Sequence, residues 1–134
     1  MPTQSRQGII FVVDDELVIS ATLGMILRHE GNDSRSFNQP DEAIKAAQVD
    51  SPDLLVTDLI MPGMTGIELA NQVRQTCPGC RVLLFSGQAS MSDLIERGKD
   101  DGIPIDHFLW KPVHPKVLLK KVEDIMNGEF MASA

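Results

Sequence analysis

The sequence predicts one doubly wound α/β domain, in which a parallel sheet is covered by helices on both faces. The chain has 134 residues, which is the usual size of a single domain. Short apolar runs of strand length alternate with segments whose apolar residues recur at helical spacing. The runs are nearly continuous, as expected for strands buried on both faces, and strands that alternate with helices favour parallel pairing.

Five segments are predicted strands, in the sheet order 2-1-3-4-5 that is common among doubly wound domains. Four of them are apolar runs rich in branched or aromatic residues, and the weaker one follows the breaker Gly31-Asn32-Asp33. In chain order the predicted strands are Ile9 to Val13, Ser34 to Phe37, Leu54 to Val56, Val82 to Phe85 and Ile105 to Trp110.

A helix is predicted after each strand. The helical stripes are formed by Ile19, Leu23, Ile26 and Leu27, then by Ala43, Ile44 and Ala47, and near the end by Leu118, Val122 and Ile125. Two further helices are expected at Gly66 to Thr76 and at Ser90 to Lys99. The predicted domain covers residues 8–127, and residues 1–7 and 128–134 are expected to be flexible termini.

The composition excludes several classes of function. With 43% hydrophobic and 23% charged residues the chain is typical of a globular protein. Its 12 basic and 19 acidic residues leave a net charge of −7, which repels a phosphate backbone, so no direct nucleic-acid binding is expected. There is no apolar run of roughly 20 residues and no secretory signal in MPTQSRQG, so we expect a cytoplasmic protein without a membrane partner.

Reactive side chains follow four of the predicted strands. Asp14 and Asp15 follow the first run, Asp58 the third, Ser86 the fourth and Lys111 the fifth, whereas the weak second strand ends without such a group. Ligands of open parallel sheets bind outside the carboxyl ends of the strands. We therefore expect carboxylates, a hydroxyl and an ammonium group to converge there.

Carboxylates packed this closely repel one another unless a cation shares the site. All-oxygen ligands without His or Cys suit Mg²⁺, which commonly binds carboxylates together with phosphate oxygens. A phosphoryl group fits this arrangement because its transfer requires mainly positioning and charge neutralisation. The residues thus predict Asp58 as a nucleophile, with Mg²⁺, Lys111 and the Ser86 hydroxyl facing the phosphoryl oxygens.

Four motifs together resemble the bacterial response-regulator receiver domain, with its flavodoxin-like fold, from Gly8 to about Met126. They are FVVDDE, PDLLVTDLIMPGMTGIEL with its D-x-x-M-P-G-x-x-G pattern, VLLFSG and FLWKP. A lone acidic pair has little value, but the acidic pair, the strand-end Ser and the Lys-Pro pair in this order and at these spacings are specific.

The resemblance implies a signalling domain rather than an enzyme, one that only phosphorylates and slowly dephosphorylates itself. Asp58 would accept a phosphoryl group from a histidine kinase or phosphotransfer protein and form an acyl phosphate. Asp15 and Asp58 would bind Mg²⁺ directly, Asp14 largely through water, and the main-chain carbonyl of Ile60 would complete the protein ligands. Lys111 would pair with the phosphoryl group.

The resemblance also implies a switch. Ser86 would hydrogen-bond the new phosphoryl oxygen, and Phe108 would move into the vacated space, which would remodel the surface of the fourth helix, fifth strand and last helix. That surface would control a downstream protein partner, with a phosphorylation-dependent homodimer as one form. The Lys111-Pro112 peptide bond would be cis.

The sequence departs from the family pattern at three places. Ile60 stands two residues after Asp58, where family members often carry a polar or flexible side chain, and Gln88 stands two after Ser86. We hypothesise that the apolar Ile60 shields the acyl phosphate from water. The stretch from Gly98 to Pro104 replaces the short link usual before the last strand, so the fourth helix is expected to end early.

Other interpretations remain open at this stage. Asp14 or Asp15 alone would cap the first helix. Cys77-Pro78-Gly79-Cys80 is a C-x-x-C motif, but it follows a helix and precedes a strand, so free thiols are favoured over a redox pair. A haloacid-dehalogenase-like phosphatase would want an aspartate where Ile60 stands. A phosphate-independent interaction module on the same fold is the remaining alternative.

Overall fold

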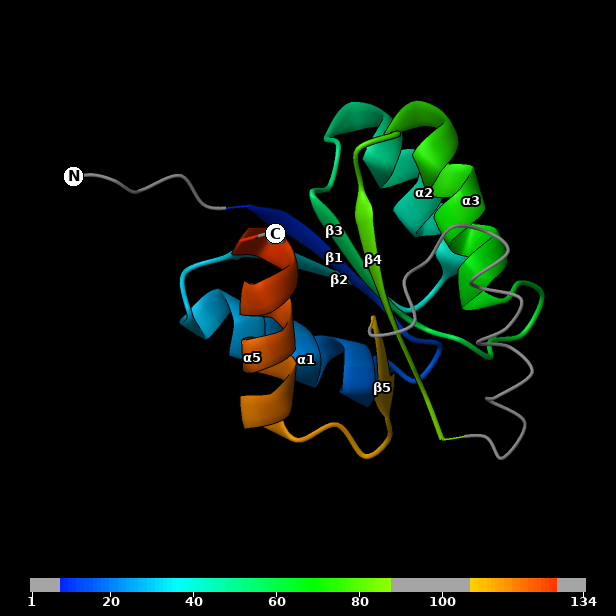
Figure 1. Cartoon of the computed structure of the whole chain (residues 1–134). Helices are drawn as coiled ribbons and strands as arrows, with labels where there is room; N and C mark the ends of the chain where they lie inside the picture. Colours follow the sequence, from blue (N-terminus) through cyan, green and yellow to red (C-terminus); the bar gives the residue numbers. More distant parts are fainter. Residues whose placement is uncertain (1–7, 88–106, 128–134) are drawn as a thin grey trace.

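The computed structural model describes residues 8–87 and 107–127 and contains a parallel sheet of five strands (Figure 1). The strand order is β2-β1-β3-β4-β5, which confirms the predicted order. All adjacent strands pair in parallel; β3 lies at the centre of the sheet, between β1 and β4. The strands are β1 (Ile9–Val13), β2 (Asp33–Phe37), β3 (Leu54–Asp58), β4 (Arg81–Ser86) and β5 (Phe108–Trp110).

Helices cover both faces of the sheet. In Figure 1, α1 and α5 lie on one face, and α2 and α3 lie on the other. The helices in the described residues are α1 (Leu17–His29), α2 (Pro40–Val49), α3 (Gly66–Thr76) and α5 (Pro115–Asn127). The predictions for the helix at Ser90 to Lys99, for the loop from Gly98 to Pro104, for Gln88 and for the two termini fall outside the described residues.

The strands differ from their predicted bounds mainly at their ends. β3 and β4 include Asp58 and Ser86, because Asp58 still pairs with Phe85 in the ladder and Ser86 with Trp110. A limit drawn at the last apolar residue therefore ends β3 and β4 too early, whereas the predicted ends of the other three strands are the observed ones. The last strand begins at Phe108 rather than at Ile105, and residues 105–106 lie outside the described part.

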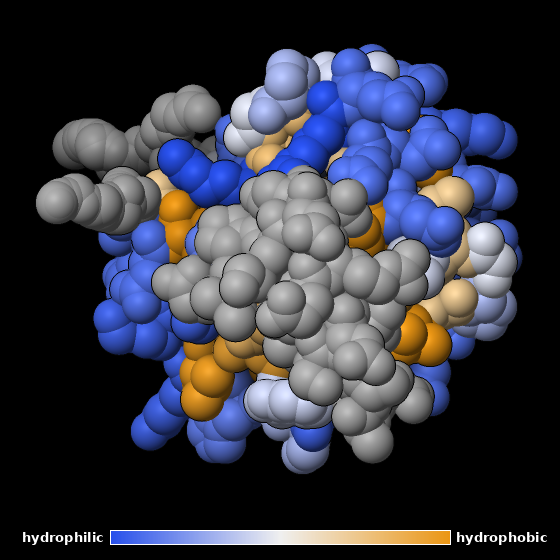
Figure 2. Space-filling model, turned by 45° about the vertical axis from the view of Figure 1, so that its right-hand side comes forward, coloured by the Kyte–Doolittle hydropathy of each residue, from blue (hydrophilic) through white to orange (hydrophobic). Residues whose placement is uncertain are grey.

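The hydropathy of one face of the molecule is seen in Figure 2. Outside the grey atoms, the face seen in Figure 2 is mostly hydrophilic, and its hydrophobic residues lie in separate small areas. None of the helices in residues 8–87 and 107–127 combines the length and apolarity needed to cross a membrane. The cytoplasmic location stays a prediction.

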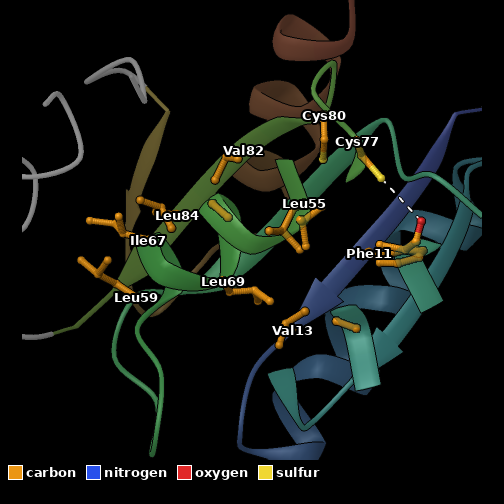
Figure 3. Close-up of a cluster of buried hydrophobic side chains, with 14 of the residues drawn as sticks. Phe11, Val13, Leu55, Leu59, Ile67, Leu69, Cys77, Cys80, Val82 and Leu84 are labelled. Atoms are coloured by element: carbon orange, nitrogen blue, oxygen red, sulfur yellow. Dashed lines mark hydrogen bonds between the residues drawn. The ribbon is translucent and has the colours of Figure 1, made fainter. Parts of the chain in front are cut away.

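The core has two layers because side chains alternate between the faces of each strand. Phe11, Leu55 and Leu84 point toward α2 and α3, and Figure 3 shows this layer. Their strand neighbours Val56 and Phe85 join the other layer, under α1 and α5. The central strands are thus apolar on both faces, and their reactive groups can only stand at the ends.

Candidate functional site

An acidic cluster lies at the carboxyl ends of β1 and β3. Asp14 directly follows β1, Asp58 is the last residue of β3, and these two strands are neighbours in the sheet. Each of Asp14, Asp15 and Asp58 offers a carboxylate oxygen within 4.8 Å of the others. Asp14 is fully buried, Asp58 is 6% exposed and Asp15 is exposed. The cluster therefore opens to solvent on the side of Asp15.

Lys111 reaches this cluster from the end of β5. Its Nζ donates a hydrogen bond to Asp58 Oδ2 at 3.1 Å and forms an ion pair with Asp14 Oδ2 at 3.1 Å. Its backbone N–H donates to the carbonyl of Ser86 at 3.0 Å, which ties the residue to β4. The Lys111–Pro112 peptide bond is cis. One ammonium group thus bridges the two buried carboxylates.

The site is electrostatically unbalanced. Burial, together with the nearby Asp14 carboxylate, raises the pKa of Asp58, and the hydrogen bond from Lys111 only partly opposes this shift. For Lys111, burial lowers the pKa, but the hydrogen bonds and charges of Asp58 and Asp14 outweigh it, so the pKa is raised. Lys111 is therefore a permanent cation at neutral pH, beside more negative charge than it can neutralise.

The free lone pairs of the cluster fit a hard divalent cation. Asp14 Oδ1 accepts the backbone N–H of Glu16 at 2.8 Å, whereas the buried Asp14 Oδ2 is paired with the Lys111 ammonium group at 3.1 Å, which Asp58 shares. One ammonium group shared by two buried carboxylates leaves negative charge uncompensated, which is costly unless a further cation joins the site. The carboxylates match the oxygen ligands that Mg²⁺ prefers. The residues present thus fit the predicted metal, although the Ile60 carbonyl as a ligand stays a prediction.

The capping alternative for Asp14 and Asp15 is not what the structure adopts. The N-cap of α1 is Glu16, and no side chain caps this helix. Asp14 bonds the N–H of Glu16 itself, so it closes the turn that leads from β1 into α1. This local contact uses one carboxylate oxygen and leaves the other directed at the cluster.

The loop after β3 is shaped by two glycines of the D-x-x-M-P-G-x-x-G pattern. Gly63 has φ +82°, a conformation that side chains disfavour. A Cβ at Gly66 would collide with the carbonyl oxygen of Asp58, so only glycine lets α3 begin this close to the end of β3. Within the loop, the N–H of Ile60 points at Asp58 Oδ1 over 3.4 Å, and Ile60 is 38% exposed. Ile60 thus lies at the rim of the cluster.

The two predicted switch residues occupy neighbouring strands. Ser86 ends β4 and is buried, while Phe108 begins β5 and is half-buried against the core layer of α2 and α3. The sheet register pairs Ser86 with Trp110 and Phe108 with Leu84. Their movement on phosphorylation stays a prediction.

A family model matches most of the chain. The model of the response regulator receiver domain covers residues 10–123, which include every predicted site residue. The chain belongs to this family. Receiver domains are signalling domains of two-component systems and interact with histidine kinases.

Curated relatives of this receiver domain are response regulators. It is 35% identical to the probable transcriptional regulatory protein TcrX of Mycobacterium tuberculosis over 77% of the chain and 43% of the relative. It is 31% identical to the alkaline phosphatase synthesis transcriptional regulatory protein PhoP of Bacillus subtilis over 92% of the chain and 50% of the relative. The chain thus spans about half the length of the curated relatives it matches.

Solved structures agree with the fold. The receiver domain superposes on the chemotaxis protein CheY4 of Vibrio cholerae with a TM-score of 0.78 and 26% identity, over 88% of this chain and 98% of the other. A receiver domain protein from Methanospirillum hungatei gives a TM-score of 0.81 and 25% identity, over 91% and 95% of the two chains. These likenesses support the doubly wound, flavodoxin-like architecture.

One residue near the site was not singled out by the sequence. Phe85 of β4 was assigned to a core strand, yet Lys111 Nζ lies 5.3 Å from the centre of its ring. Both residues line a cavity of about 430 Å³, together with Val18, Ile19, Thr22, Leu23, Pro112 and Val113. An aromatic residue directly before the strand-end Ser86 is the only sequence signal, and apolar strands carry such residues routinely.

The C-x-x-C motif lies away from the acidic cluster, between α3 and β4. Cys77 and Cys80 are free and buried, and Cys77 Sγ donates to the carbonyl of Ala47 at 3.5 Å (Figure 3). Burial raises the pKa of the Cys80 thiol to about 12, and the nearby Cys77 adds to the shift. The free thiols agree with the interpretation favoured from the sequence.

Proposed function

We propose that Asp58 is the phosphoacceptor of this receiver domain. A carboxylate oxygen attacks the phosphorus of a phosphohistidine, the P–O bond forms as the P–N bond breaks, and the histidine nitrogen keeps the electron pair. The donor is a histidine kinase or a phosphotransfer protein. The observation that carries this proposal is the position of Lys111 Nζ, 3.1 Å from carboxylate oxygens of both Asp58 and Asp14.

Asp14, Asp15 and Asp58 would hold Mg²⁺, with the Ile60 carbonyl as the further protein ligand. When bound, the ion supplies neutralisation of the negative charge shared by the carboxylates and the phosphoryl oxygens. Asp14 contributes its buried Oδ2, which shares the Lys111 ammonium group with Asp58. Asp15 is exposed, so an ion enters the cluster from solvent on the side of this residue.

The remaining residues act on the phosphoryl group itself. Lys111 already donates to Asp58 Oδ2 and pairs with a phosphoryl oxygen once the acyl phosphate forms. The Ser86 hydroxyl moves to donate a hydrogen bond to another phosphoryl oxygen, and Phe108 fills the space that Ser86 leaves. The surface of β5 and α5 changes as a result and controls a downstream protein, including by formation of a homodimer. Self-dephosphorylation is slow because the apolar Ile60 at the rim keeps water away.

A protein donor is supported by the apolar surface beside the cluster. Leu17 and Val18 at the start of α1 are 62% and 76% exposed, and the cavity next to them includes Lys111. Exposed apolar side chains at the rim of a site are typical of protein contacts. A donor protein seated on α1 would bring its phosphohistidine close to Asp58.

The test is the intact mass of the protein after incubation with acetyl phosphate and Mg²⁺. Wild type is expected to gain one phosphoryl group, and Asp58→Asn and chelator-treated wild type are expected to gain none. Asp124→Asn is the matched control, because Asp124 is an exposed carboxylate that pairs with Lys120 on α5. Labelling of Asp58→Asn at the wild-type level would contradict the assignment of the acceptor.

The alternatives make different predictions in the same experiment. A phosphate-independent interaction module takes no label even though it is folded. A haloacid-dehalogenase-like phosphatase turns over acetyl phosphate repeatedly, but it needs a second carboxylate where this chain has Ile60. The position of Lys111 between the two buried carboxylates favours the phosphoacceptor.

A further inference from the structure

Lys111 is held by more than its two carboxylate partners. Its side chain is 24% exposed, and its ammonium group lies over the ring of Phe85, 5.3 Å from the ring centre. Phe85 is 1% exposed, and it is fixed on both sides by the sheet, opposite Asp58 on β3 and Leu109 on β5. The ring is therefore a rigid surface beside a long and otherwise flexible side chain.

The contact has the geometry of a cation–π interaction. A cation within about 6 Å of an aromatic centroid is attracted to the negative face of the ring, and the attraction is stronger where water is excluded. The ring offers no lone pair, so it does not compete with carboxylate or phosphoryl oxygens for the ammonium protons. It thus attracts the charge without fixing which oxygen receives the hydrogen bond.

The backbone of Phe85 adds a second link to the acceptor. Its carbonyl accepts the N–H of Leu59, the residue directly after Asp58, at 2.9 Å. Phe85 therefore holds the chain next to Asp58 through its backbone carbonyl and contacts the Lys111 ammonium group through its ring.

We propose that Phe85 is a positioning residue for phosphoryl transfer, whose ring holds the Lys111 ammonium beside Asp58. This inference rests on the proposed function of Asp58. The two carboxylates draw the ammonium toward the cluster, and the ring restricts its sideways motion, so Lys111 is already in place when a phosphoryl group arrives. After transfer, the ring retains the ammonium while its hydrogen bonds pass to phosphoryl oxygens.

Phe85 also belongs to the core layer under α1 and α5, so its replacement affects packing. The matched control is Phe11→Leu, because Phe11 is equally buried in β1 but faces α2 and α3 in the other core layer. Phe85→Leu removes the aromatic face and keeps an apolar side chain. Phe85→Tyr keeps the face and serves as the rescue variant.

The first readout is the NMR shift of the Lys111 side chain in the unphosphorylated protein, assigned by its absence from Lys111→Gln. Protons held over an aromatic face are displaced upfield by the ring current. We expect this displacement in wild type, Phe11→Leu and Phe85→Tyr, and its loss in Phe85→Leu. Undisplaced Lys111 protons in wild type would overturn the inference, whether or not Asp58 is phosphorylated.

The second readout is the rate of labelling by acetyl phosphate and Mg²⁺. Phe85→Leu is expected to be labelled about two- to tenfold more slowly, which is the range of a partly desolvated cation–π contact. Phe85→Tyr and Phe11→Leu should stay near the wild-type rate. Equal rates for wild type and Phe85→Leu would overturn the inference. If wild type takes no label at all, the proposed function fails, and the ring-current shift alone decides whether Phe85 holds Lys111.

Discussion

Asp58 and Cys80 are two buried ionisable groups of the same small domain, and burial raises the pKa of both. Their neighbours differ. Asp58 faces Lys111 at 3.1 Å and a second carboxylate, Asp14, beside the exposed Asp15. Cys80 is packed among apolar side chains of the core, and its thiol donates a hydrogen bond to the backbone carbonyl of Arg81.

The comparison teaches that burial alone does not make a reactive site. A buried group becomes reactive when a counter-charge favours its ionised form and when a reactant can approach. For Asp58, Lys111 partly offsets the effect of burial on the pKa, and the exposed Asp15 marks the side from which a reactant can approach, which supports the proposed phosphoacceptor. For Cys80, burial and the neighbouring Cys77 both disfavour the thiolate, which is the form that reacts.

The largest expected effect concerns the thiol. A pKa of about 12 against the ordinary 9.0 leaves Cys80 with about a thousandth of the usual thiolate. Alkylation of Cys80 by iodoacetamide at pH 8, followed by peptide mapping, should therefore be about a thousandfold slower in the native protein than in the chain unfolded by urea. Equal rates in the two states would show that the core around Cys80 opens freely.

The next effect concerns the counter-charge of Asp58. Lys111→Gln removes the cation and should lower the rate of labelling by acetyl phosphate about a hundredfold, as expected for a lost electrostatic contact to a transition state. The matched control is Lys120→Gln, whose ammonium pairs with Asp124 on the exposed side of α5. A wild-type labelling rate for Lys111→Gln would show that the counter-charge does not distinguish Asp58 from Cys80.

Substitutions of Asp58 and Cys80 should change the free energy of unfolding in opposite directions. The pKa of Asp58 is raised on folding, so its ionised form disfavours the native state above that pKa. In the absence of Mg²⁺, Asp58→Asn should raise the free energy of unfolding by about 0.5 to 2 kcal/mol at neutral pH. The gain should shrink as the pH falls through the pKa of folded Asp58, where the wild-type carboxyl becomes neutral.

Cys80→Ala provides the contrast in the same urea titrations. It removes a buried side chain without relieving any charge, so it should lower the free energy of unfolding by about 1 kcal/mol. Destabilisation by Asp58→Asn at neutral pH would show that the ion pair with Lys111 outweighs the burial of the carboxylate.

The smallest expected effect tests the rim of the site. Ile60→Asn replaces the apolar side chain at the mouth of the cluster with one that holds water, so the acyl phosphate should decay severalfold faster once acetyl phosphate is removed. Val49→Asn is the control, because Val49 is 82% exposed at the end of α2. Slower decay in Ile60→Asn than in wild type would sink the shielding hypothesis.

Sequence patterns predicted the elements well because local residue types carry that information. The interval predicted as Gly66 to Thr76 is observed as α3, where Thr65 and Glu68 form a reciprocal capping box that sets the start of the helix. The limits of the strands were less accurate, because Asp58 and Ser86 are polar and yet pair within the sheet. Hydrogen bonds to a neighbouring strand are not encoded in the hydropathy of one segment.

The sequence predicted which residues would form the site but not how their side chains would contact one another. The order of reactive groups after the strands placed Asp14, Asp58 and Lys111 at one edge of the sheet, because parallel strands end on the same side. The contact of Phe85 with Lys111 could not be found this way. It depends on which face of β4 the ring occupies and on the path of a side chain that enters from β5.

The sequence by itself determined the element types, their order and the identity of the groups at the strand ends, because periodicity and turn residues act over short stretches of chain. Only the tertiary structure decided how these groups interact. The bridge from Lys111 to Asp14 and Asp58 and the raised pKa of Asp58 arise where the ends of separate strands meet in a buried site. Burial and distance set the strength of charge interactions, and both are properties of the packed chain.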